Sequence, residues 1–132
     1  YIQRSEKDTL QLKNAPELSK LTQSIEEIQK LCKKNGVDLY VYLIPSKWDV
    51  YGNLIENKNL KISKSYTYLN KYLAEYSMDK NYEYLDIKKP FIKEAKKSIS
   101  QDTLLYWKDG THLNYLGNKV LSNILISKFN NK

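Results

Sequence analysis

The chain has 132 residues and a net charge of +7, and 41% of its residues are hydrophobic. This length and composition predict a single globular domain at most and exclude a disordered chain. With one histidine and only Cys32 as a thiol, an internal disulfide, a cysteine-rich metal site and a structural zinc site are excluded. We therefore expect Cys32 to be a buried structural thiol, and we expect no metal and no cofactor.

The positive charge comes from lysines scattered along every segment, and Arg4 is the only arginine. Base and phosphate recognition favours the bidentate fork of arginine, so the sequence argues against a nucleic-acid partner, whereas a basic surface suits an acidic cell-wall or capsule polymer. No apolar run approaches the about 18 residues that a membrane span needs, and the N-terminus lacks a signal-peptide pattern. Any targeting segment would lie outside this chain.

The first elements in chain order are a polar arm over residues 1–13 and a helix over residues 14–34. Asn14 is the expected N-cap, Pro16 lies in the first turn, and Glu17 is placed for a capping box. Apolar residues spaced by three or four positions predict one buried stripe on this helix: Leu18, Leu21, Ile25, Ile28 and Leu31. Asn35-Gly36 is expected to end it.

Residues 37–44 are β-branched, aromatic or leucine except for Asp38, which predicts a central parallel strand covered on both faces. The rest of the chain reads as an alternation of exposed connections, helices and strands. The expected elements are a polar connection over 54–64, a helix over 66–76 with packing tyrosines, a strand over 82–87, a helix over 90–99, a strand over 103–107 and a closing helix over 114–129 whose apolar face is buried on the sheet. This order predicts an α/β fold with a three-layer, flavodoxin-like sheet and helices on both faces.

The only histidine lies in the string Asp109-Gly110-Thr111-His112-Leu113-Asn114-x-x-Gly117, in a turn between an apolar run and a helix. An Asp three residues before a His can orient one ring nitrogen and leave the other free to take a proton from a hydroxyl. We expect the two side chains to lie within hydrogen-bond reach, at the carboxyl ends of the strands. The alternative is that His112 is a surface turn residue and Asp109-Gly110 only a turn dipeptide.

This string resembles the last conserved block of the SGNH/GDSL hydrolases, in which Asp-x-x-His precedes the final helix. The resemblance covers residues 18–129, which correspond to the C-terminal half of that fold. It implies that residues 14–132 form one SGNH-like domain. It also implies that Asp109 and His112 are catalytic. The family's Gly-Asp-Ser nucleophile block is absent. Ser46 comes nearest among the serines, but its Pro-Ser-Lys context does not match. The resemblance therefore places the nucleophile in sequence outside this chain.

A second stretch, Pro45-Ser46-Lys47-Trp48-Asp49-Val50-Tyr51, follows the strand over 37–44. It is similar to a segment of the SGNH-like polysaccharide acetyltransferases of the alginate-acetylation type, although that branch has Asp-x-His where this chain has Asp-x-x-His. We expect a set of substrate-binding residues on the same side of the sheet as the Asp and His: Lys47, Trp48, Tyr51, Trp107 and Asn114. The alternative is a plain surface loop that Trp48 and Tyr51 pack down.

The function that follows from the resemblance is part of a carbohydrate O-acyl esterase or O-acetyltransferase acting on a cell-surface polysaccharide, in an extracytoplasmic or cell-envelope location. Its partners would be a carbohydrate or other acylated substrate and the missing portion of the same protein. The first alternative is a non-catalytic SGNH-like module that binds an anionic glycan or a partner protein. The second is a flavodoxin-like regulatory domain, which would carry acidic residues where residues 37–44 end in Pro-Ser-Lys.

Overall fold

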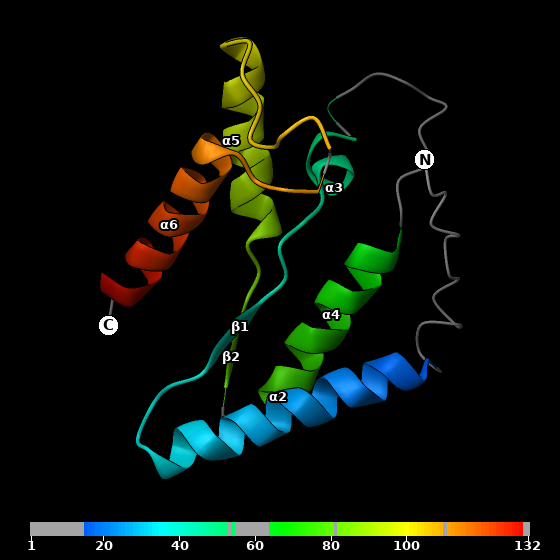
Figure 1. The fold of residues 1–132 in the computed structure, drawn as a ribbon, viewed down its shortest axis with the longest axis vertical. Helices are drawn as coiled ribbons and strands as arrows, with labels where there is room; N and C mark the ends of the chain where they lie inside the picture. Colours follow the sequence, from blue (N-terminus) through cyan, green and yellow to red (C-terminus); the bar gives the residue numbers. More distant parts are fainter. Residues whose placement is uncertain (1–14, 53, 55–63, 81, 110, 131–132) are drawn as a thin grey trace. The chain divides into compact units, whose positions relative to one another are not determined.

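A computed structural model of the chain describes residues 15–52, 54, 64–80, 82–109 and 111–130. Figure 1 shows their elements, which are α2 (Pro16–Lys34), β1 (Tyr40–Tyr42), α3 (Lys47–Tyr51), α4 (Lys64–Met78), β2 (Glu83–Leu85), α5 (Lys88–Ser100) and α6 (Tyr115–Asn130). The expected arm over residues 1–13 and most of the connection over 54–64 lie outside the described residues. The chain separates into two compact units, Tyr1–Tyr42 with Ser63–Leu85 and Leu43–Ile62 with Asp86–Lys132.

The fold is broadly α/β, since the described residues form helices and one pair of parallel strands. β1 and β2 pair in the register Tyr40↔Glu83, Val41↔Tyr84 and Tyr42↔Leu85. Both strands are shorter than predicted, and all three residues of β1 are half-buried. The parallel pairing is as predicted, whereas a central strand covered on both faces and a three-layer sheet are not confirmed by these two strands.

Helix α2 begins and ends close to the predicted positions, but its start is capped differently. Pro16 occupies the first turn, while the N-cap is Ala15, which makes no side-chain capping bond. The prediction of Asn14 as N-cap was wrong, and Asn14 itself lies outside the described residues. The C-terminal end is as expected: Gly36 has a φ of +66°, a left-handed conformation that glycine adopts without steric cost.

The buried face of α2 is not the predicted leucine stripe. Thr22 and Ile25 are buried, while Leu21, Ile28 and Leu31 are 38%, 49% and 63% exposed. The reason is that the core of this unit is a cluster of Ile25 with Leu73 and Tyr82, which covers only the part of the helix surface around Ile25. Helical spacing shows which residues share a face, but the packing partner decides which part of that face is buried.

Helix α4 supplies most of the packing in this unit, as its apolar spacing predicts. Leu73 is 2% exposed, and Tyr72 and Tyr76 pack against the same cluster. The Tyr76 hydroxyl donates a hydrogen bond of 2.5 Å to Glu26, to which Lys80 Nζ also donates over 2.7 Å. These two bonds lower the pKa of the Glu26 carboxyl, with the Lys80 bond contributing most. Tyr72 and Tyr76 are thus packing residues, as expected for the tyrosines of this helix.

The second unit is built around α5, with α3 and α6 against it, as Figure 1 shows. Phe91 and Ala95 on α5 are fully buried, and Val50 on α3 is equally inaccessible. The rings of Tyr51 and Phe91 pack around Tyr106, with centroid distances of 6.2 and 6.4 Å. Pro90 lies in the first turn of α5, where its missing N–H costs nothing.

The closing helix α6 has nearly the predicted bounds, but its apolar face is not buried. Gly117 is its only buried residue within Tyr115–Asn130, and Leu116, Ile126 and Phe129 are 36%, 51% and 46% exposed. Within its own unit α6 packs against α5, whereas β1 and β2 belong to the other unit, so burial of α6 on a sheet stays a prediction. No described helix combines the length and the apolar character needed to cross a membrane.

Candidate active site

The segment that carries the only histidine is a tight loop and not the third strand predicted over residues 103–107. Its two sides meet in one antiparallel bridge, Tyr106↔Leu113. The Trp107 N–H donates to the His112 carbonyl, and the Asn114 N–H donates to the Leu105 carbonyl, each over 3.0 Å. The Trp107 N–H and the Leu105 carbonyl thus find their partners on the returning side of the same loop. A neighbouring strand is not needed to satisfy them, which explains why the predicted strand is absent among the described residues.

Asp109 and His112 make direct side-chain contact. The distance between Asp109 Oδ2 and His112 Nδ1 is 2.7 Å. The other carboxylate oxygen accepts the backbone N–H groups of Thr111 at 3.0 Å and His112 at 3.1 Å. Because Oδ1 is fixed by the backbone of its own turn, Oδ2 can point only toward the ring that follows. The Asp-x-x-His spacing thus produces the contact that the sequence predicted.

This contact keeps the Asp109 carboxyl ionised. The side-chain bond to His112, followed by the two backbone bonds, lowers the pKa of Asp109 from its ordinary value of 3.8 to about 2. An ionised carboxylate can only accept, so the Nδ1 atom of His112 is assigned as the donor, and Nε2 carries the lone pair when the ring is neutral. The hydroxyl of Thr111 lies 3.2 Å from the same Nδ1.

The far side of the imidazole faces outward. The side chain of His112 is 77% exposed and that of Asp109 is 48% exposed. Within the described residues, the hydrogen bonds of the ring are all made by Nδ1, so Nε2 is open to an incoming group. This arrangement can do what a general base does, which is to accept a proton at Nε2 while a carboxylate holds Nδ1.

Asn114 and Gly117 fix the loop to the start of α6, and we call this pair the Asn114/Gly117 latch. The side chain of Asn114 donates from Nδ2 to the Leu104 carbonyl over 2.6 Å and accepts the Gly117 N–H over 3.0 Å. A Cβ on Gly117 would overlap the carbonyl oxygen of Leu105. The Asn-x-x-Gly part of the motif is therefore explained by a capped helix end that approaches the loop backbone closely.

The loop is supported from beneath by the two buried tyrosines, Tyr51 and Tyr106. The Leu105 N–H donates to the Tyr51 hydroxyl over 2.9 Å, and that hydroxyl lies 3.0 Å from Ser98 Oγ. The Tyr106 hydroxyl donates to the Pro45 carbonyl over 2.7 Å, and burial raises the pKa of this phenol. The structure therefore brings together the two stretches that the sequence singled out, residues 45–52 and the histidine loop.

The residues expected to bind substrate divide into exposed and buried groups. Trp48 and Trp107 are 51% and 60% exposed, and Lys47 is half-buried. Tyr51 is only 3% exposed and supports the loop from inside. Asn114 uses its side-chain amide in the latch. The exposed aromatic residues remain available to a ligand, whereas the polar groups of Tyr51 and Asn114 are engaged within the protein.

Sequence reasoning missed that the stretch after β1 is a helical turn and not a loop. Ser46 Oγ donates to Asp49 Oδ2 over 2.5 Å and accepts the Asp49 N–H over 3.3 Å, while Asp49 Oδ2 also accepts the Ser46 N–H over 2.9 Å. This reciprocal pair is a capping box at the start of α3. The Ser-x-x-Asp spacing was the available signal. It also commits the hydroxyl of Ser46 to a structural bond.

Metal-binding residues do not gather in the described part of the chain, which contains no group of three or more His, Cys, Asp or Glu side chains placed to hold an ion. Cys32 is half-buried, so it is less enclosed than expected. Comparison of the chain with models of protein families, with curated proteins and with solved structures gives no match in any of the three. The roles of Asp109 and His112 thus rest on their geometry and on the sequence motif.

Proposed function

We propose that this chain is part of an SGNH-type carbohydrate O-acyl esterase or O-acetyltransferase that acts on a cell-surface polysaccharide. His112 is the general base, Asp109 orients it, and a serine from sequence outside this chain is the nucleophile. The observation that carries the proposal is the 2.7 Å contact between Asp109 Oδ2 and His112 Nδ1, which leaves Nε2 exposed.

In this proposal Nε2 of His112 takes the proton of the serine hydroxyl as its oxygen attacks the acyl carbonyl. The Asp109 carboxylate stabilises the imidazolium, which then protonates the departing alkoxide and leaves an acyl-serine ester. Water attacks this ester in an esterase, and a sugar hydroxyl attacks it in a transferase. The low pKa of Asp109 supports this scheme, since the carboxylate stays charged while the ring cycles.

The same proposal gives roles to the exposed aromatic side chains beside the loop. Trp48 and Trp107 offer flat apolar surfaces on which the CH groups of a sugar ring can pack. Lys47 is the first residue of α3, directly after the N-cap Ser46, and would attract an anionic polysaccharide. We also propose that the sequence with the serine contributes the further strands of a three-layer sheet that includes β1 and β2.

The experiment compares this chain with the longer protein that contains the serine segment, using an O-acetylated oligosaccharide as substrate. The longer protein should release or transfer acetate, and His112→Ala should reduce kcat by several powers of ten, with a smaller loss for Asp109→Asn. Lys47→Ala should cost much less, since it only helps to position the substrate. Turnover that is unchanged in His112→Ala would refute the proposal.

A matched measurement locates the nucleophile. The 132-residue chain alone should show no turnover, because the base has no serine to activate. Hydrolysis by this chain that is abolished by replacing one of its own serines would show that the nucleophile lies within it.

A second candidate function is a non-catalytic module that holds an anionic glycan or a partner protein. Two observations favour it: the net charge of +7, and an Nε2 atom that contacts no hydroxyl within the described residues. Glycan binding that survives His112→Ala, in a longer protein without acyl-ester activity, would favour this module over the enzyme.

A further inference from the structure

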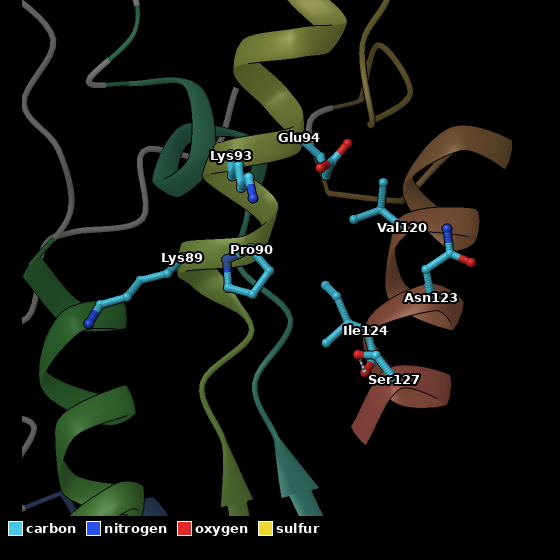
Figure 2. Close-up of a pocket in the computed structure, with 8 residues that line it drawn as sticks. All are labelled: Lys89, Pro90, Lys93, Glu94, Val120, Asn123, Ile124 and Ser127. Carbon is cyan, nitrogen blue, oxygen red and sulfur yellow. Dashed lines mark hydrogen bonds between the residues drawn. The ribbon is translucent and has the colours of Figure 1, made fainter. Parts of the chain in front are cut away.

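A cavity of about 550 Å³ lies between α5 and α6, on the part of the chain that the proposed function does not use. Figure 2 shows the side chains that line it, which are Lys89, Pro90, Lys93, Glu94, Val120, Asn123, Ile124 and Ser127. This volume is in the range of sites for single small molecules. All eight residues belong to the same compact unit.

Apolar side chains from both helices form the floor of the cavity, namely Pro90 from α5 and Val120 and Ile124 from α6. In Figure 2, Val120 and Ile124 project from α6 toward α5, where Pro90 faces them, whereas the amide of Asn123 points away from α5. Pro90, Val120 and Ile124 are half-buried, so their apolar surface is partly covered even without a ligand. The hydroxyl of Ser127 donates to the Ile124 carbonyl over 2.8 Å, so a bound molecule would meet mainly apolar surface at this wall.

The side chains that line the cavity carry more positive than negative charge, since Lys89 and Lys93 face one carboxylate, Glu94. Glu94 accepts a hydrogen bond of 2.7 Å from Lys97, which lies outside the lining, so its charge is compensated from there. Lys89 and Lys93 are exposed and make no ion pair within the described residues. In Figure 2, Lys93 lies next to Pro90, while Lys89 extends away from α6. The ammonium group of Lys93 is therefore the positive charge without an ion-pair partner that lies next to the apolar side chains.

We propose that this cavity binds an organic monoanion with a short apolar body, of the class of a medium-chain carboxylate. Its carboxylate pairs with Lys93, while its chain covers Pro90, Val120 and Ile124. One cation next to the floor matches one negative charge, and the apolar surface matches a chain rather than a small inorganic ion. The site is independent of Asp109 and His112.

The test is a titration of the ¹⁵N-labelled chain with octanoate, followed by NMR. Saturable shifts should appear at the lining residues of α5 and α6. Lys93→Gln should weaken binding about two- to fivefold, as expected for an exposed ion pair, and Ile124→Asn about tenfold. Lys96→Gln and Ile126→Asn are the matched controls, because they alter exposed residues of the same two helices outside the lining. Both controls should bind as the unmodified chain does.

Two ligands of similar size separate charge recognition from simple apolar adsorption. Octanol and octylammonium should bind more weakly than octanoate. Equal binding of all three, shifts centred on the exposed Leu116, Ile126 and Phe129, or no saturable binding of octanoate would each overturn the proposal. His112→Ala should leave octanoate binding unchanged, so that this test and the test of the proposed function fail independently.

Discussion

Helices α4 and α6 are both predicted by apolar spacing, but they are held in the protein in different ways. Leu73 of α4 is 2% exposed in the centre of a side-chain cluster, whereas Ile126 of α6 is 51% exposed. What fixes the start of α6 is the backbone contact at Gly117 and the capping bonds of Asn114. The comparison shows that α4 depends on side-chain burial, while α6 depends on a close backbone approach that also shapes the histidine loop.

The largest expected effect comes from removing the side-chain core of the first unit. Leu73→Ala should lower the free energy of unfolding by about 2–5 kcal/mol, because it leaves a cavity among well-packed side chains. The matched change in α6, Ile126→Ala, should alter it by less than about 0.5 kcal/mol, since that side chain is exposed. Urea denaturation followed by circular dichroism measures both. Similar losses for the two variants would remove the distinction between the helices.

The second effect is the change in the free energy of unfolding caused by a substitution in the Asn114/Gly117 latch. Its sign is opposite to that of the same substitution in an ordinary helix. In an ordinary exposed helix, Gly→Ala stabilises by about 0.5–1 kcal/mol. Gly117→Ala should instead destabilise by about 1–3 kcal/mol, because the new methyl group overlaps the Leu105 carbonyl. Thermal unfolding measures the loss, and NMR shifts should change at Trp107 and His112 as the loop moves. A stabilised variant with unchanged loop shifts would show that the close approach is absent.

A smaller effect is expected from the titration of Asp109. Its pKa is lowered in the folded protein to about 2, so the stability that this carboxylate contributes is present above its unfolded value near 3.8. That contribution is lost as the pH falls through about 2. The ¹³C shift of the carboxyl, followed in the intact chain and in His112→Ala, reports the pKa. Without the imidazole partner, the pKa should move back toward its ordinary value.

The sequence predicted the helices and the Asp109–His112 contact well because both depend on local spacing. Apolar residues spaced by three or four positions predict α4 and α6, and an offset of three positions from Asp109 to His112 suffices for a turn that joins their side chains. Apart from the N-cap of α2, the predictions that failed depend on contacts between residues far apart in the sequence. The exposure of Leu31 depends on what packs against α2, and the predicted strand over 103–107 would need a partner that the sequence does not name. Only α3 was missed although its Ser46-x-x-Asp49 signal was local.

The central claim is that Asp109 fixes the imidazole of His112 with Nδ1 as donor and Nε2 as the free base. The most direct measurement is the ¹⁵N NMR shift of both ring nitrogens at a pH where the ring is neutral. The account predicts that the Nδ1–H form dominates in the intact chain and that this preference disappears in Asp109→Ala. A ring with the proton mainly on Nε2, or the same distribution in both proteins, would contradict it.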